Sequence, residues 1–168
     1  MNLISDLKLN DLISPTLTPD EYLKVYGDRI MNEYESYQPK SSVLDEIKEI
    51  LKNKHEKLKI IALGAEWCPD CSKNIPRMIK LIKDLKIEEV SLDILYGIMM
   101  NALHKPGETI WHKKRSPPEA TDPKFDLKAI PTFYIFNDAG EHFGLIRENP
   151  KGFSTLEEAI LEILKKSL

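Results

Sequence analysis

Residues 66–71 read Glu-Trp-Cys-Pro-Asp-Cys and contain both cysteines of the chain, Cys68 and Cys71. The preceding run, residues 59–63, is short, mainly apolar and contains β-branched residues, which is typical of a buried strand. Apolar residues then recur at helical spacing, at Ile75, Met78, Ile79, Ile82 and Leu85. The sequence therefore predicts a strand, a turn and a helix, with Cys68 at the start of the helix and Cys71 in its first turn.

The start of a helix is a favourable place for a thiolate. The first N–H groups of a helix have no partner within it, and the helix dipole adds a partial positive charge there. The thiolate is the form of cysteine that attacks a disulfide or binds a metal. We therefore expect the chemistry of this chain to lie at residues 66–71.

Length and composition indicate a single folded domain. The 168 residues are enough to bury a core without disulfides or metals. Hydrophobic residues at 42% and charged residues at 30% match folded globular chains. The formal net charge of −3 predicts neither a nucleic acid nor a membrane as partner of the whole chain. No apolar stretch approaches the roughly 18 residues of a membrane span.

The first residues do not read as a secretion signal. Residues 1–14 alternate polar and apolar types, include Asp6 and Asp11, and lack a basic segment followed by an unbroken apolar run. We therefore expect a cytoplasmic protein. In a reducing compartment, a close cysteine pair is more often catalytic or metal-binding than a structural disulfide.

Residues 1–57 are predicted to form an N-terminal helical extension packed on the core. The Thr-Pro-Asp-Glu run at residues 18–21 combines a capping threonine, a proline at the first helical position and a glutamate at the third. A second helix begins at Ser41 or Ser42 and has one apolar face. The tyrosines of this region are expected to pack on the core rather than to form a binding face: Tyr22, Tyr26, Tyr34 and Tyr37.

Residues 58–168 are predicted to form an α/β domain. A strand at 58–63, a helix over 71–86 and a strand near 89–95 make a strand–helix–strand unit. A crossover helix of this length implies that the two strands are parallel.

The last part of the chain adds a hairpin and a helix. An aromatic strand at 131–136 is followed by a turn and by an alternating strand at 141–147, which returns antiparallel. Ser154 is expected to cap a final helix, with Glu157 as its capping partner. The whole predicts a mixed sheet of about four strands, flanked by helices.

Residues 97–128 form an irregular insertion in this pattern. Over 97–118, four basic residues outnumber one acidic residue, Glu108, which leaves a net charge of +3. The basic residues are Lys105, Lys113, Lys114 and Arg115. Two interpretations stay open: the insertion recognises an acidic partner or substrate, or it is a solvated surface loop with Trp111 packed on the body.

Several motifs of the chain occur together in one family. They are Trp-Cys-x-x-Cys at 67–71, a proline five residues after the second cysteine (Pro76), and Ile-Pro-Thr at 130–132 before an aromatic strand. On these residues the chain, over roughly 58–168, resembles the thioredoxin superfamily. The Pro-Asp dipeptide between the cysteines and the segment 122–132 are similar to thioredoxin-related proteins with a Trp-Cys-Pro-Asp-Cys site. The resemblance implies a thioredoxin-like fold, to which residues 1–57 are an addition.

The resemblance also implies an activity. Cys68 would be the exposed thiolate that forms a mixed disulfide, and the more buried Cys71 would resolve it and release reduced substrate. The expected protein is a thiol–disulfide oxidoreductase that reduces protein or small-molecule disulfides. It would receive electrons from an unidentified reductase and need no cofactor or metal.

Residues around the cysteines receive roles from the same resemblance. Pro131 would follow a cis peptide bond and place the Ile130 backbone opposite the cysteines, where an extended substrate pairs with it. Trp67 would shield the disulfide and, with Pro69, form part of the substrate surface. Asp70 would modulate the site, because its charge opposes thiolate formation at a neighbouring sulfur.

One position departs from the family pattern. Many thioredoxins have a buried aspartate six residues before the first cysteine, where it assists proton transfer to the second thiol; this chain has Ala62 there. We expect the pKa of Cys68 to lie below the free value of about 8.5 but well above the strongly oxidising extreme of about 3.5.

Two other functions are consistent with the sequence. The chain could be a non-catalytic binding module that captures a partner through a sheet edge and the basic loop. It could also bind a metal through Cys68, Cys71, His104 and His112, although the seven residues between the two histidines exceed the usual zinc spacing. A cluster shared by the cysteines of a dimer is a further form of this alternative. The sequence selects neither the substrate nor an oligomeric state.

Overall fold

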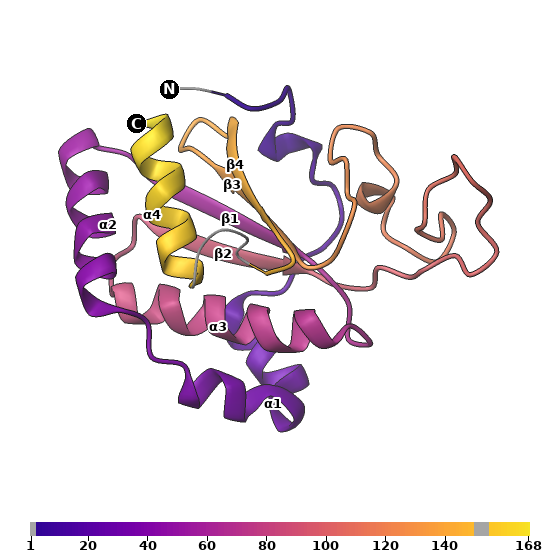
Figure 1. Ribbon diagram of the computed structural model, residues 1–168, viewed down its shortest axis with the longest axis horizontal. Helices are drawn as coiled ribbons and strands as arrows, with labels where there is room; N and C mark the ends of the chain where they lie inside the picture. The colour runs from indigo at the N-terminus through magenta and orange to yellow at the C-terminus, as the bar shows by residue number, and fades with distance from the viewer. Residues whose placement is uncertain (1–2, 150–154) are drawn as a thin grey trace.

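A mixed four-stranded sheet lies at the centre of the molecule (Figure 1). The computed structural model describes residues 3–149 and 155–168. The strands lie in the order β2-β1-β3-β4, with β1 and β2 parallel and the other two neighbouring pairs antiparallel. Their bounds are Leu58–Leu63 (β1), Val90–Leu95 (β2), Thr132–Phe136 (β3) and His142–Arg147 (β4). The expected mixed sheet of about four strands is confirmed.

Helices precede, interrupt and follow the strands. The capping box expected at residues 18–21 is present: Glu21 N–H donates to Thr18 Oγ1, and Thr18 N–H donates to Glu21 Oε1. The helices of the described residues are α1 (Pro19–Ser36), α2 (Ser41–Lys54), α3 (Pro69–Leu85) and α4 (Leu156–Ser167), with short 3₁₀ turns η1 (Leu9–Asp11) and η2 (Pro118–Ala120). Within the described ranges no helix is long and apolar enough to cross a membrane.

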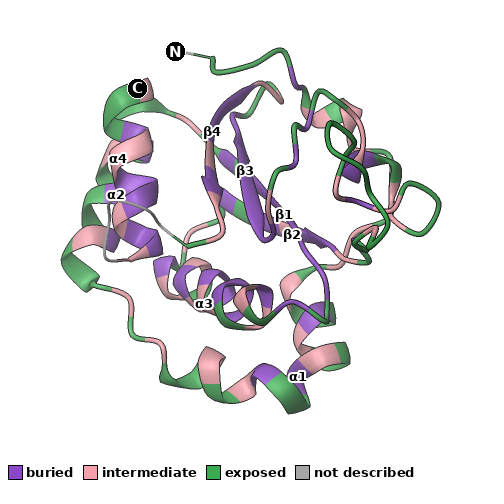
Figure 2. Cartoon of the chain, turned by 45° about the vertical axis from the view of Figure 1, so that its right-hand side comes forward, coloured by how far each residue is buried: buried purple, intermediate pink, exposed green. Residues whose placement is uncertain are grey.

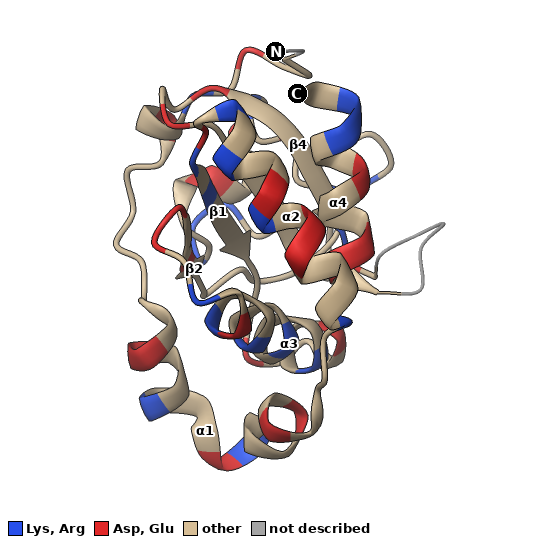
Figure 3. Ribbon diagram, turned by 90° about the vertical axis from the view of Figure 1, so that its left-hand side faces the viewer, with Lys and Arg blue, Asp and Glu red and all other residues tan. Residues whose placement is uncertain are grey.

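One face of the sheet is covered by α3 and α4 (Figures 1 and 2). A Cβ on Gly144 of β4 would lie 2.5 Å from Ile163 Cγ2, so α4 packs directly against the strand backbone there. Outside this layer, α1 packs on α3 and α2 packs on α4. The charged residues of α2 and α4 lie mostly toward solvent (Figure 3), and Lys165 of α4 pairs with Glu46 of α2 at 3.6 Å.

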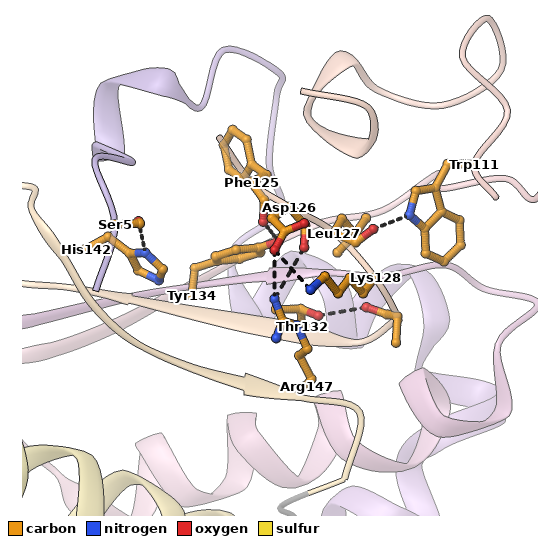
Figure 4. Close-up of polar contacts among 11 residues, drawn as sticks. Ser5, Trp111, Phe125, Asp126, Leu127, Lys128, Thr132, Tyr134, His142 and Arg147 are labelled. Carbon is orange, nitrogen blue, oxygen red and sulfur yellow. Dashed lines mark hydrogen bonds and ion pairs between the residues drawn. The ribbon is translucent and has the colours of Figure 1, made fainter. Parts of the chain in front are cut away.

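The opposite face is covered by irregular chain. Leu7, fully buried, belongs to the N-terminal arm that packs there. The arm also pairs Leu17 with Ile94 of β2 through two backbone hydrogen bonds of 2.8 Å. Figure 4 shows the segment around Phe125 lying on the same side of the sheet as Ser5. Local periodicity gave no prediction for the arm, because its order comes from these contacts.

The final helix begins one residue later than expected. Its N-cap is Thr155, whose Oγ1 accepts a hydrogen bond from Glu158 N–H. The expected cap, Ser154, lies outside the described residues. Glu157 is fully buried and binds groups near the start of α2 instead: it accepts hydrogen bonds from Tyr37 Oη and from Lys40 N–H.

His142 links the stability of the fold to pH. Its ring is buried beside Tyr134 and Phe136, at centroid distances of 5.6 and 5.3 Å. Its Nδ1 lies 2.7 Å from Ser5 Oγ (Figure 4). Burial, assisted by the charge of Arg147, lowers the pKa of His142 to about 4.

The protein is therefore expected to lose stability as the pH falls from about 6.5 to 4, because only the unfolded chain binds a proton at His142 in that window. Above about pH 6.5 this contribution is fully present. The loss should amount to about 3 kcal/mol and should be absent from His142→Asn. Urea unfolding of both proteins at pH 7, 5.5 and 4 measures the difference. Equal pH slopes for the two proteins would contradict the assignment.

Candidate active site

Three chain segments meet at one edge of the sheet. Because β1 and β2 are parallel and β3 runs opposite to β1, the ends of β1 and β2 and the beginning of β3 share this edge. Residues 64–68, the chain after Leu95, and the Ile130–Pro131 bond therefore come together beside the start of α3 (Figure 1). This topology places the two cysteines opposite residues that lie about 60 positions further along the chain.

Cys68 is the N-cap residue of α3. Its Sγ accepts a hydrogen bond from Cys71 N–H at 3.2 Å, in the way that a serine or aspartate oxygen caps a helix. The same sulfur lies 3.6 Å from the carbonyl oxygen of Ile130. Cys68 is only 5% exposed. The expectation of an exposed sulfur is therefore wrong, because the Ile130 segment covers part of the helix start.

The pKa of the Cys68 thiol is lowered to about 7. The largest cause is the hydrogen bond that the Cys71 thiol donates to Cys68, and the backbone N–H groups of Cys71 and Asp70 act in the same direction. Burial and the negative charge of Asp70 oppose them. The shift has the direction expected from the helix start, and its size leaves thiolate and thiol both well populated at neutral pH.

Cys71 lies behind Cys68 and is fully buried. Its pKa is raised far above the usual range, first because its proton is shared with Cys68 and then because of burial. Gly64 makes room for the sulfur: a Cβ on Gly64 would lie 2.9 Å from Cys71 Sγ and 3.1 Å from the Tyr96 ring. Sequence reasoning did not identify Gly64; the only signal was a glycine between the end of a strand and the cysteine motif.

Removing the Cys71 thiol should raise the pKa of Cys68. In Cys71→Ala the largest cause of the lowered value is gone, so the midpoint should move from about 7 toward the free value of about 8.5. In Cys71→Ser a hydroxyl donor stays in place, and the shift should be smaller. Thiolate absorbance at 240 nm against pH measures both variants. An unchanged midpoint in Cys71→Ala would show that the backbone amides alone set the pKa.

The segment before β3 is fixed by side chains of β3 itself and of the insertion (Figure 4). Tyr134 Oη donates to the carbonyl of Phe125 at 2.7 Å, and the Trp111 indole N–H donates to the carbonyl of Leu127 at 2.6 Å. Thr132 Oγ1 donates to the carbonyl of Ala129 at 2.7 Å. These bonds hold the chain that carries the Ile130 carbonyl toward Cys68.

The Ile130–Pro131 peptide bond is cis, and both residues are buried. The structure thus brings Ile130 and Pro131 together with Cys68 and Cys71, although the two pairs are far apart in the sequence.

Trp67, Pro69 and Asp70 lie on the outer side of the pair. Trp67 is 44% exposed, and its indole N–H donates to the carbonyl of Ile98 at 2.8 Å. Pro69 is exposed and occupies the first position of α3, where a missing N–H costs no hydrogen bond. Asp70 is half-buried, and its charge raises the pKa of both cysteines. The residues that the resemblance assigned to the active site therefore lie around one site: Trp67, Cys68, Pro69, Asp70, Cys71, Ile130 and Pro131.

Helix α1 contributes an aromatic wall behind the site. Tyr22 and Tyr26 of α1 and Tyr96 after β2 form a cluster with ring centroids 5.0–5.2 Å apart. Tyr22 Oη and Tyr96 Oη are hydrogen-bonded at 2.7 Å, and burial raises the pKa of both hydroxyls. The packing expected for Tyr22 and Tyr26 is observed, but their position beside the cysteines was not foreseen.

A pocket of about 440 Å³ opens beside Trp67. Tyr96 and Met99 form part of its lining, as does an ion pair in which Arg29 Nη1 lies 2.9 Å from Glu66 Oε1. A larger pocket, about 570 Å³, lies at the other end of the sheet around the end of α2 and does not adjoin the cysteines.

The four-residue metal site considered above is not assembled. Within residues 3–149 and 155–168, no group of three or more His, Cys, Asp or Glu residues lies close enough to hold a metal ion. His104 lies in the exposed insertion, where its Nδ1 is 2.9 Å from the carbonyl oxygen of Asn101.

A thioredoxin family model matches residues 16–96, a span that begins before α1 and ends after β2. A search of curated proteins found no match.

Solved structures are similar over most of the chain. An HIV epitope-scaffold is 16% identical, with a TM-score of 0.63 and coverage of 96% of this chain and 100% of that one. A Pseudomonas aeruginosa protein of unknown function is 17% identical, with a TM-score of 0.55 and coverage of 88% and 87%. Thioredoxin from Fasciola hepatica is 17% identical, with a TM-score of 0.41 and coverage of 73% and 91%. Together with the family match, the sheet order and flanking helices identify a thioredoxin-like fold.

Proposed function

We propose that this protein is a thiol–disulfide oxidoreductase that reduces disulfides through Cys68 and Cys71. The observation that carries the proposal is the arrangement of the pair. Cys68 Sγ, with its lowered pKa, accepts the Cys71 amide at the start of α3 and lies beside the Ile130 carbonyl. A role in packing alone would require neither the lowered pKa nor the second sulfur behind the first.

In the first step, the Cys68 thiolate attacks one sulfur of the substrate disulfide. A bond forms between Cys68 Sγ and that sulfur, the substrate S–S bond breaks, and the other substrate sulfur leaves as a thiolate that takes a proton from water. The backbone of Ile130 and the surfaces of Trp67 and Pro69 are where we place the substrate chain.

In the second step, Cys71 releases the enzyme from the mixed disulfide. Its thiol loses a proton, its sulfur attacks Cys68 Sγ, and the second substrate sulfur leaves and is protonated. The substrate has then gained two electrons and two protons, and Cys68 and Cys71 are joined by a disulfide. The loss of the Cys71 proton is favoured in the mixed disulfide, because the Cys71 thiol no longer donates a hydrogen bond to a Cys68 thiolate, and the negative charge of that thiolate is also gone.

A separate reductase must return two electrons to the Cys68–Cys71 disulfide in each cycle. The substrate is a disulfide in a protein or a small molecule. The competing proposal, a non-catalytic binding module, gives no role to the lowered pKa of Cys68.

The reduction of insulin by dithiothreitol tests the proposed function. The wild-type protein should accelerate the appearance of turbidity from the free insulin B chain, in proportion to its concentration. The same protein after alkylation with iodoacetamide is the matched control and should have no effect. If the wild-type and the alkylated protein give the same rate of insulin reduction, the proposal is wrong and the binding module is favoured.

A further inference from the structure

The insertion carries a group of exposed basic side chains. Lys113, Lys114 and Arg115 form one exposed turn, and Lys105 is exposed nearby in the sequence. In the part of the chain that the structure describes, none of the four forms an ion pair. The rest of the chain carries a net negative charge, so this turn is a local positive feature on an acidic protein.

The turn is held in place by buried and backbone contacts. Trp111, 3% exposed, is bonded to the Leu127 carbonyl and pairs with Met100 as an isolated bridge. His112 N–H donates to the carbonyl of Met99 at 2.7 Å, and Ser116 Oγ accepts from Met99 N–H at 2.9 Å. A surface that is already ordered loses little conformational freedom when a ligand binds to it.

These contacts connect the basic turn to the active site. Met99 lies against both ends of the turn and also lines the 440 Å³ pocket beside Trp67. Met99, Met100 and Leu103 are 37%, 49% and 87% exposed. Figure 2 shows that the insertion around them is mostly exposed. Of the three, Met99 lines the pocket, and the other two follow it closely in the sequence. Exposed apolar side chains next to a pocket are typical of a protein-binding surface, and methionine adapts to varied partners.

We propose that this surface binds an acidic segment of a protein substrate and presents its disulfide to Cys68. The docking surface consists of Met99, Met100, Leu103 and the basic residues Lys105, Lys113, Lys114 and Arg115. Carboxylates of the substrate would face the turn, and a neighbouring apolar side chain would enter the pocket beside Trp67. The inference rests on the proposed function and names the class of substrate for it. Charge complementarity would act mainly on the rate of encounter, which is why the local charge matters on a chain of net charge −3.

Binding can be measured without catalysis. The probe is a synthetic peptide with three glutamates flanking a leucine and with serine in place of cysteine; a second peptide has lysine in place of glutamate. Titration into the full-length protein, followed through the methyl NMR signals of Met99 and Met100, should show shifts with the glutamate peptide only. The proposal would be overturned if neither peptide shifts these signals or if the lysine peptide shifts them. Shifts caused by an oligonucleotide, with none caused by the glutamate peptide, would overturn it as well.

Turnover adds a matched pair of variants. The first variant has glutamine in place of Lys113, Lys114 and Arg115. The control variant has glutamine in place of three lysines that are exposed at the other end of the sheet: Lys52, Lys54 and Lys57. With disulfide-containing versions of the two peptides and low salt, the wild type and the control should reduce the glutamate peptide about tenfold faster than the lysine peptide. The first variant should lose this preference, as should the wild type in 0.5 M salt.

The two proposals fail in different ways. Reduction of the neutral hydroxyethyl disulfide reports only on the cysteines, and it should be equal in all three proteins. If this reduction occurs but both variants keep the same peptide preference, the docking surface is wrong. If hydroxyethyl disulfide is not reduced, the proposed function is wrong, and the NMR titration still decides whether the docking surface exists.

Discussion

Cys68→Ser is expected to lower insulin-reductase activity to the level of dithiothreitol alone. Serine can occupy the N-cap position and accept the Cys71 amide, so α3 should keep its start. Its hydroxyl does not ionise near neutral pH, however, and it cannot form a disulfide. The loss should therefore come from the chemistry and not from the fold, and circular dichroism and the urea midpoint should stay close to those of the wild type.

Cys71→Ser should fail at a different step. The Cys68 thiolate can still attack, but no thiol lies behind it to complete the exchange, so a substrate adduct should accumulate on Cys68. The asymmetry between the two cysteines follows from the structure. Cys68 has a pKa of about 7, whereas Cys71 is fully buried beside Gly64 and its pKa is raised. Non-reducing gels and peptide mapping check this. An adduct on Cys71 of the Cys68→Ser variant, with none on Cys68 of Cys71→Ser, would reverse the assigned roles.

Glu157→Ala should cause the largest loss of stability among the polar substitutions considered. The carboxylate is fully buried and accepts hydrogen bonds from Tyr37 Oη and, at 2.7 Å, from Lys40 N–H. Its removal leaves two donors without this partner in the interface that joins α4 to the link between α1 and α2. Hydrogen bonds to a charged acceptor contribute more than neutral ones, so we expect a loss of about 3 kcal/mol in the free energy of unfolding.

Urea unfolding measures this loss, and a surface glutamate of the same helix is the control. Glu162 forms an ion pair with Lys166 at 3.5 Å, where the lysine side chain is 72% exposed. Glu162→Ala should change stability by about 0.5 kcal/mol or less. Glu157→Gln keeps an acceptor oxygen and should fall between the two. Equal losses for Glu157→Ala and Glu162→Ala would mean that the buried carboxylate does not stabilise the fold.

The parts of the fold that the sequence predicted depend on local signals. The apolar run at 59–63, the capping box at 18–21 and the helical spacing after Cys71 each decide a structure within a few residues. Because a crossover helix of that length requires parallel strands, even the pairing of β1 with β2 followed from local evidence. The same applies to Cys68 and Cys71, whose position at the start of the helix followed from the strand before them and the helical spacing after them.

The parts that could not be predicted depend on contacts between distant residues. Gly64 matters because Cys71 and Tyr96 lie against it, and Trp111 matters because its indole reaches the carbonyl of Leu127. Glu157 has the spacing of a capping residue in the sequence. In the folded protein, however, its carboxylate accepts hydrogen bonds from Tyr37 Oη and Lys40 N–H instead. The low exposure of Cys68 has the same origin, since the Ile130 segment that covers it is 62 residues away.

The central claim is that Cys68 and Cys71 act in sequence on one substrate disulfide. Intact-mass spectrometry after a single turnover tests it most directly: the reduced wild-type protein is mixed with a small excess of a peptide disulfide and then quenched with acid. The account predicts a protein lighter by two hydrogens, with Cys68 joined to Cys71, and one equivalent of the peptide in its dithiol form. Two results would contradict this account. One is a protein of unchanged mass together with intact peptide disulfide, and the other is a stable adduct of protein and peptide as the only product.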